Sequence, residues 1–223
     1  MDALNRHFVV PNGLVFDIGA HVGDRTASFL RLGASVIAIE PQPRVFRALR
    51  LLHGRAPGVV LLPCAVGKEI GEVTLHLNAR NPTVATVAPD FIEAARGAPG
   101  WTDEVWESCV TVPMTTLDAL IIRCGVPDFI KIDVEGHEAE VLAGLSTAVP
   151  ALSFEFTTIQ RHVAKTCVER LGALGSYRFN LSLREDHALQ HSDWLTADAL
   201  HTEMDALPDA ANSGDVYAVL SQE

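Results

Sequence analysis

Residues 14–24 read Leu14-Val-Phe-Asp-Ile-Gly-Ala-His-Val-Gly-Asp24, an apolar segment that runs directly into a turn with two glycines. The apolar part, 14–18, has the composition of a buried strand, and a helix is expected to begin near Asp24. Glycine at positions 19 and 23 lets the backbone approach a ligand without an intervening Cβ, at the place where open α/β sheets bind small molecules. This stretch therefore predicts an α/β sheet with a ligand site at its first strand-to-helix turn.

Short apolar strands and amphipathic helices alternate along the rest of the chain. Such alternation favours a mostly parallel sheet covered by helices on both faces. All 223 residues fit a single domain, because no linker divides them. Further strands are predicted at 35–40, 59–66, 128–134, 151–157, 177–183 and 215–220, and helices at 44–53, 138–145, 160–174 and 192–206.

A stretch rich in proline and glycine, residues 78–108, interrupts this alternation. It contains Trp101 and Trp106 and is flanked by extended segments at 72–77 and 109–113. Long irregular insertions in compact domains are usually functional covers or mobile segments. We therefore expect an irregular lid over the substrate, with a simple loop as the alternative.

Composition and charge restrict the classes of function. A hydrophobic content of 48% with 20% charged residues excludes a disordered chain. The net charge of −11 disfavours contact with the phosphates of nucleic acids. The chain shows no N-terminal targeting segment and no apolar run long enough to cross a bilayer, so we expect a cytoplasmic protein without a membrane partner.

The turn after the first strand favours a nucleoside that lacks a phosphate. A dinucleotide motif would have glycine where this chain has His21 and Asp24, and an acid at that position repels phosphate. S-adenosylmethionine has a sulfonium and an ammonium group, so Asp17 and its acidic surroundings suit this ligand. Glu40, 21 residues after Gly19 at the end of the second strand, is placed to accept hydrogen bonds from both ribose hydroxyls.

The densest chemistry in the chain lies in Asp128-Phe-Ile-Lys-Ile-Asp-Val-Glu-Gly-His-Glu138. Lys131 is part of an apolar strand and therefore needs a carboxylate partner or a route to solvent. Asp133, Glu135 and His137 then follow at the carboxyl end of this strand. Because neighbouring strands lie about 4.8 Å apart, the strand at 151–157 brings Glu155 to the same edge.

Three uses of this acidic cluster remain open from the residues alone. The side chains can deprotonate an acceptor hydroxyl, Asp133 and Glu155 can hold a divalent cation, or the acids can simply pair with Lys131 and nearby arginines. Catalysis is favoured because several ionisable groups converge on the predicted crevice. His137 is the preferred base, since its ordinary pKa of about 6.5 lets it accept a proton at neutral pH.

These motifs together resemble the FkbM family of S-adenosylmethionine-dependent methyltransferases. The resemblance spans about residues 14–157 and implies a Rossmann-like class I methyltransferase fold, with a mostly parallel seven-stranded sheet whose last strand is antiparallel. It also implies methyl transfer to a hydroxyl of a small metabolite such as a sugar or polyketide. His21 is a departure, because the family more often has Asn there. The motifs that carry the resemblance are 15–23, 38–41, 65–67, 114–118 and 129–138.

The predicted site residues fall into a cofactor group and a catalytic group. The expected partner is a small-molecule hydroxyl acceptor. A homodimer is left open. Two rival functions are a nicotinamide-dependent oxidoreductase and a non-catalytic binding protein that retains the fold. If Mg²⁺ is used, its predicted ligands are Asp133 and Glu155. The predicted catalytic residues are His137, Asp133, Glu135 and Glu155. The predicted cofactor-binding residues are Asp17, Gly19, Ala20, His21, Gly23, Glu40, Pro41, Cys64, Ala65 and Asp133.

Overall fold

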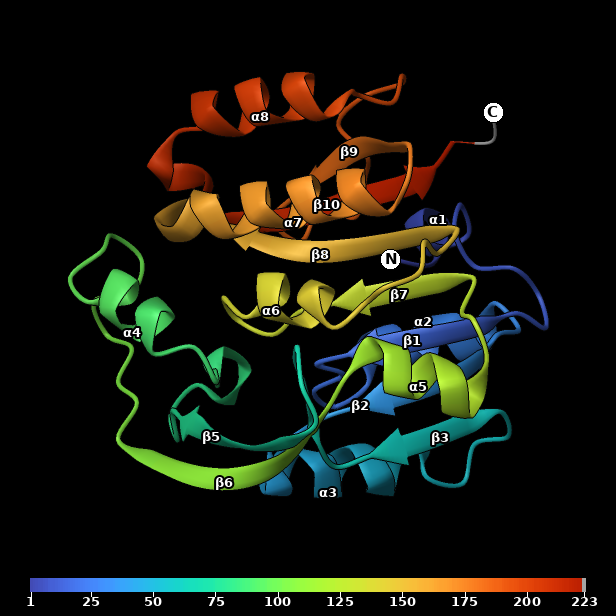
Figure 1. Ribbon diagram of the computed structural model, residues 1–223. Coiled ribbons are helices and arrows are strands. Elements are labelled where there is room, and N and C mark those ends of the chain that lie inside the picture. Colours follow the sequence, from blue (N-terminus) through green and yellow to red (C-terminus); the bar gives the residue numbers. More distant parts are fainter. Residues whose placement is uncertain (222–223) are drawn as a thin grey trace.

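Seven strands form the main sheet of the computed structural model, which describes residues 1–221 (Figure 1). Their order across the sheet is β3-β2-β1-β7-β8-β10-β9. Neighbours from β3 to β8 pair in parallel, whereas β10 pairs antiparallel with both β8 and β9. This confirms the expected mostly parallel sheet with an antiparallel last strand. The strands are β1 (Leu14–Ile18), β2 (Ser35–Ile39), β3 (Val59–Leu62), β7 (Phe129–Ile132), β8 (Ala151–Thr157), β9 (Tyr177–Leu183) and β10 (Ser213–Leu220).

Helices cover both faces of this sheet, because side chains alternate along each buried strand. In β1, Val15 packs into one hydrophobic cluster with Phe29 and Leu49, and Phe16 packs into the other with Leu117 and Val141. The first cluster involves α1 (Asp2–Asn5), α2 (Asp24–Arg31) and α3 (Pro43–His53). The second involves α5 (Leu117–Cys124), α6 (Glu138–Ala143), α7 (Arg161–Leu174) and α8 (Ala197–Ala206). Among residues 1–221, no helix combines the length and apolar character that a membrane span requires.

A second sheet of three strands lies beside the carboxyl ends of the main strands, in the order β4-β6-β5 (Figure 1). It consists of β4 (Ala65–Val66), β5 (Gly71–Leu77) and β6 (Ser108–Thr115). The single strand expected over 59–66 was therefore wrong: it divides into β3 and β4, which belong to different sheets. Pro63 and Cys64 separate the two, and Val66 pairs with Thr115 of β6 instead of continuing along β2.

The segment 78–108, expected to be irregular, contains a 3-10 turn at Pro82–Val84 and helix α4 (Pro89–Ala95). Its flanks, β5 and β6, form an antiparallel pair. A small apolar core orders the segment, because Phe91 is fully buried and contacts the rings of Trp101 and Trp106 edge-on, at centroid distances of 5.1 and 6.1 Å. Its role as a lid remains a prediction.

Candidate active site

A pocket of about 460 Å³ lies at the carboxyl ends of β1, β2 and β7, beside β8. The lining includes Gly19 after β1, Glu40 after β2, Asp133 after β7 and Glu155 of β8. This is the edge at which open α/β sheets bind ligands. The pocket is thus where the glycine turn and the acidic cluster were expected to meet.

The turn after β1 brings backbone instead of side chain to the pocket wall. The backbone N–H groups of Gly19 and Ala20 both donate to the carbonyl oxygen of Ile39, at 2.9 Å. Gly19 has a φ of 77°, and a Cβ at this position would collide with the backbone oxygen of Asp133. Glycine is therefore required here both by conformation and by space.

Glu40 follows β2 and is almost completely buried, with 3% of its surface exposed at the pocket. One carboxylate oxygen accepts the backbone N–H of His21 at 2.9 Å and the other accepts that of Gln42 at 2.7 Å. Burial raises the pKa of Glu40 to about 7, although these hydrogen bonds act in the opposite direction. Each oxygen has a further lone pair with which to accept a ligand hydroxyl.

Two of the residues predicted to bind the cofactor, Asp17 and Gly23, do not line the pocket. Asp17 is completely buried beneath it, where its Oδ2 accepts the Thr26 hydroxyl at 2.5 Å and burial raises its pKa. Asp17 also pairs in register with Lys131 of β7. A Cβ on Gly23 would lie 2.5 Å from the ring of His53, so this glycine permits packing against α3. The remaining predicted cofactor-binding residues, Gly19, Ala20, His21, Glu40, Pro41, Cys64, Ala65 and Asp133, do line the pocket.

Asp133, Glu135 and Glu155 form an acidic trio in which one oxygen of each residue lies within 4.8 Å of the other two. The Nζ of Lys131 donates to Asp133 Oδ2 at 2.6 Å, so of the two alternatives expected for this lysine, a carboxylate partner or a route to solvent, the structure shows the carboxylate partner. Glu155 Oε2 is buried and accepts no hydrogen bond from residues 1–221. Burial, reinforced by the neighbouring carboxylates, raises the pKa of Glu135 and Glu155 well above the ordinary range.

His137 lines the pocket but lies near different groups from the trio. A Cβ on Gly67 would be 3.2 Å from His137 Nε2, so this ring lies against the turn after β4. The charges that act on it are those of Glu140 and Lys68, and burial lowers its pKa. The sequence thus predicted a single cluster, whereas the structure brings the three acids together and places His137 beside the second sheet.

The lining has a strongly acidic character. It includes six Asp and Glu residues but only two Lys and Arg residues, namely Lys131 and Arg25. Arg25 Nη2 is 3.4 Å from Asp215 Oδ2, so part of its charge is already balanced. Lys131 is likewise paired with Asp133, so the lining offers little unpaired positive charge to a phosphate.

Several lining residues were not identified from the sequence. Arg25 had an indirect signal, because it occupies the first turn of the helix that follows the glycine turn. Trp101 also had an indirect signal, because it belongs to the segment expected to cover the substrate. No sequence signal pointed to Asn212 and Ser213, because they belong to the distant C-terminal region. Asn212 contacts another lining residue, Trp101, whose Nε1 donates to Asn212 Oδ1 at 3.0 Å.

Comparison with known proteins gives a family match over most of the chain. The model of the methyltransferase FkbM domain matches residues 17–207. Among curated proteins, "Hexuronic acid methyltransferase AglP" of Haloferax volcanii is 28% identical over 161 residues. That alignment covers 71% of this chain and 60% of the relative, so the chain spans about 60% of the length of the relative that it matches.

Solved structures with a similar arrangement of elements include precorrin-6y C5,15-methyltransferase from Geobacter metallireducens GS-15. It aligns over 98% of this chain and 84% of its own, with 13% identity and a TM-score of 0.49. Fibrillarin from Aeropyrum pernix, solved with bound S-adenosyl-L-methionine, aligns over 95% of this chain and 68% of its own, with 13% identity and a TM-score of 0.47.

Proposed function

The chain belongs to the FkbM methyltransferase family, and from this premise we propose that it transfers a methyl group from S-adenosylmethionine to a hydroxyl oxygen of a small metabolite. The observation that carries the proposal is Glu40. It is a buried carboxylate, held by two backbone N–H groups, in a pocket next to a glycine turn. This combination suits a ribose whose two hydroxyls donate to one acid.

The residues present fit S-adenosylmethionine better than a nicotinamide dinucleotide. S-adenosylmethionine supplies a methyl group activated by a positively charged sulfur. Both cationic side chains of the lining are paired with acids, Lys131 with Asp133 and Arg25 with Asp215, so the pocket offers no unpaired cation to the pyrophosphate that a nicotinamide cofactor would bring. Its excess of carboxyl groups suits a ligand with sulfonium and ammonium charges. Gly19 and Ala20 allow close approach of the ligand at the strand end.

We further propose that the acceptor is a sugar or a similar polyhydroxylated molecule. Carboxylates of the acidic trio can accept hydrogen bonds from its hydroxyls, and Trp101 contributes an aromatic surface to the same pocket. The curated relative is named for methylating a hexuronic acid, which supports a sugar-like acceptor.

We assign removal of the hydroxyl proton to the acidic trio, with Glu155 as the acceptor of the proton, instead of to His137. Glu155 lines the pocket, and its Oε2 accepts no hydrogen bond from residues 1–221, so this oxygen is available to take a proton. Burial and the neighbouring carboxylates raise its pKa above the ordinary range, which makes it a stronger base than an exposed carboxylate. His137 has a lowered pKa, and neither Asp133 nor Glu155 is among the charges acting on it. Positioning the acceptor oxygen in line with the transferred methyl supplies most of the rate, on the order of 7 to 11 kcal/mol in favourable cases.

A divalent cation is the alternative use of the same oxygens. Three carboxylate oxygens within 4.8 Å of one another fit the oxygen-rich coordination of Mg²⁺. Dialysis against EDTA separates the two uses: turnover by the general-base route is unchanged, whereas turnover by a cation-assisted route is lost and returns when Mg²⁺ is added.

The main experiment measures binding first and turnover second. Calorimetry with S-adenosylmethionine and with NAD compares the two cofactors, and we expect binding of the former alone. The protein is then incubated with S-adenosylmethionine and a panel of neutral sugars, hexuronic acids and non-sugar alcohols, and methylated products are detected by mass. Preferential binding of NAD would overturn the proposal, and cofactor binding without any transfer would favour the binding-protein alternative.

A further inference from the structure

The charge of this acidic chain is unevenly distributed. Residues 41–68 contain five of its 17 Lys and Arg residues and none of its 28 Asp and Glu residues. This stretch includes all of α3. One basic region therefore stands out on a protein whose net charge is −11.

Most of these basic side chains lie on the outer side of α3. Its inner side is anchored to the protein by Val45 and Leu49, which are buried. Arg44, Arg47 and Arg50 are exposed, and Arg55 is exposed just beyond the helix end. Across residues 1–221, the side chains of these four arginines form no ion pair and no hydrogen bond, unlike Arg25, Arg31 and Arg161.

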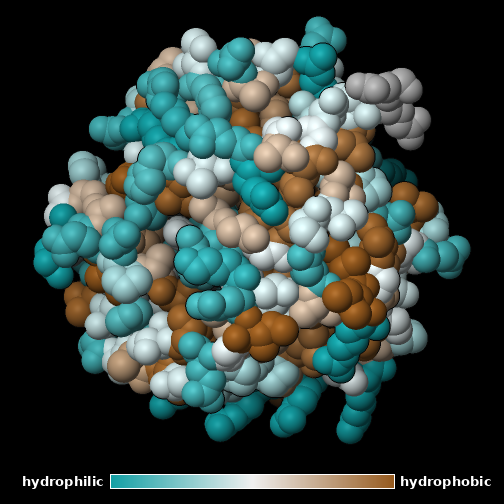
Figure 2. Space-filling view, in the orientation of Figure 1, coloured by the Kyte–Doolittle hydropathy of each residue, from teal (hydrophilic) through white to brown (hydrophobic). Residues whose placement is uncertain are grey.

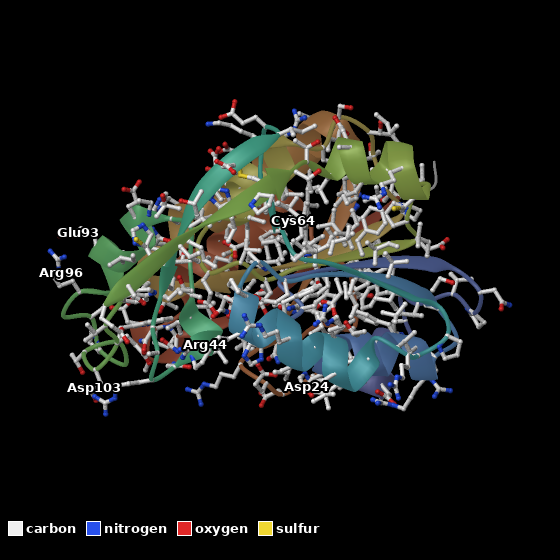
Figure 3. The ribbon with its side chains drawn as sticks, turned by 90° about the horizontal axis from the view of Figure 1, so that it is seen from below. Asp24, Arg44, Cys64, Glu93, Arg96 and Asp103 are labelled. Carbon is white, nitrogen blue, oxygen red and sulfur yellow. The ribbon has the colours of Figure 1, made fainter. Side chains whose placement is uncertain are left out.

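The figures show the same region from two sides. In Figure 1, α3 lies along the lower edge of the molecule, and Figure 2 shows hydrophilic side chains projecting from that edge. In Figure 3, seen from below, α3 is on the near side and Arg44 is labelled at its first turn. Asp24 is labelled next to α3 in this view but is ion-paired with none of the arginines within the described residues.

Two large apolar side chains are exposed among these arginines. Leu51 is 86% exposed and Leu52 is 64% exposed, at the last turn of α3 between Arg50 and Arg55. Adjacent exposed leucines surrounded by cationic side chains are typical of a surface that enters the interface of a membrane. Neither leucine packs against the two large hydrophobic clusters.

Contrary to the expectation from the sequence that the protein has no membrane partner, we propose that residues 43–55, here called the α3 surface, dock on a bilayer that contains anionic lipids. The arginines contact the headgroups, and Leu51 and Leu52 enter the boundary between headgroups and acyl chains. Charge complementarity selects an anionic partner, and the exposed leucines select a bilayer over a nucleic acid, which offers them no apolar environment.

A second copy of this chain is a poorer occupant of the α3 surface. Contact between this basic surface and an acidic face of another copy joins two different patches. Such a contact is heterologous and propagates into rings or open filaments instead of closing as a two-fold dimer.

Docking also orients the active-site pocket. Gln42, the residue before α3, lines the pocket, and its Nε2 donates to the carbonyl oxygen of Pro82 at 2.8 Å. The first turn of α3 is therefore directly next to the pocket wall. A bilayer held against the α3 surface lies close to the side of the pocket formed by the residues after β2.

The test is co-sedimentation of the full chain with vesicles of phosphatidylcholine, with or without phosphatidylserine. We expect binding only to the vesicles with phosphatidylserine, and weaker binding at high salt. An arginine near an anionic membrane contributes about fivefold to the partition coefficient, so Arg47→Ala with Arg50→Ala should weaken binding about 25-fold. Leu51→Ser with Leu52→Ser should weaken it at least about tenfold and leave the salt dependence unchanged.

The matched control changes two exposed arginines elsewhere, Arg6→Ala with Arg178→Ala, and should leave vesicle binding unchanged. All variants alter exposed residues, and calorimetry with S-adenosylmethionine checks that each is folded and that the pocket is intact. Equal binding to both kinds of vesicle, or equal weakening by the control, would overturn the proposal. So would stronger binding to RNA or polyglutamate that is insensitive to the leucine substitutions.

Discussion

The carboxylate of Glu40 is fixed before any ligand binds, because the backbone N–H groups of His21 and Gln42 each hold one of its oxygens. If Glu40 binds the ribose as proposed, Glu40→Ala removes its hydrogen bonds to the two hydroxyls and leaves these N–H groups without their acceptor. We expect it to weaken S-adenosylmethionine binding by about 1.5 to 3 kcal/mol. Calorimetry measures this loss, with Glu69→Ala as an exposed control. Unaltered affinity would remove Glu40 from the cofactor site.

Glu155 and His137 are distinguished by substitution. Glu155→Gln keeps the shape of the side chain but removes its capacity to take a proton, so we expect turnover to fall by about two to four decades. His137→Ala should have a smaller effect on turnover, because the ring lies against the turn after β4. Single-turnover rates at saturating S-adenosylmethionine measure both. A larger loss in His137→Ala would restore the base predicted from the sequence.

The meeting of the three acids was predictable from the sequence, whereas the position of the His137 side chain was not. The Lys131–Asp133 pair follows from a lysine in an apolar strand, and the approach of Glu155 follows from the spacing of adjacent strands. The side-chain position of His137 cannot be predicted from strand alternation, because Glu135 and Gly136 both have left-handed φ values, 56° and 88°. A residue such as Glu135 rarely adopts this conformation, so strand alternation fails at that point.

The segment between β5 and β6 is joined to the active site by defined contacts. Thr86 Oγ1 donates to the backbone oxygen of Glu135 at 2.7 Å, and the Trp101 ring donates to Asn212 at 3.0 Å. Both partners belong to other parts of the chain, the turn after β7 and the residue before β10. Loss of these contacts should loosen the segment without unfolding the main sheet.

Thr86→Val tests this connection, since it keeps the size of the side chain and removes the hydroxyl. We expect faster hydrogen exchange in residues 78–108 and a higher KM for the acceptor, with unchanged affinity for S-adenosylmethionine. Thr111→Val, at an exposed position of β6, is the matched control. If both variants exchange at the wild-type rate, the hydroxyl of Thr86 does not hold the segment.

Elements with strong local patterns were predictable, and those that depend on distant partners were not. The strands at 14–18, 151–157 and 177–183 have the predicted limits, because each is a continuous apolar or alternating run. β4 is only two residues long and exists because Val66 pairs with Thr115, a partner far along the chain. Helix α4 likewise depends on residues farther along the chain, because Phe91 is buried by Trp101 and Trp106 instead of by its own sequence neighbours.

Across the whole molecule, folding buries several carboxyl groups in and around the pocket. Burial raises the pKa of Glu40 and of Glu138 to about 7, and also raises the pKa of Asp17, Glu135, Glu155 and Asp215. A carboxyl whose pKa is higher in the folded state binds more protons when folded than when unfolded. The contribution of Glu40 and Glu138 to the free energy of unfolding therefore decreases as the pH rises from about 4.5 to about 7.

The ligand-free protein should accordingly be more stable at pH 5 than at pH 8. Glu138 is the informative residue, because it is buried outside the main pocket and its Oε1 accepts the backbone N–H groups of Val134 and Gly136 at 3.0 and 3.3 Å. Glu138→Gln retains an acceptor oxygen but cannot ionise, so it should reduce the difference in the free energy of unfolding between pH 5 and pH 8 by about 2.5 kcal/mol. His21 and His137 act in the opposite direction below about pH 6.5, because their pKa values are lowered by burial. Urea unfolding at both pH values measures the difference, and an equal difference in wild type and Glu138→Gln would show that Glu138 does not contribute to it.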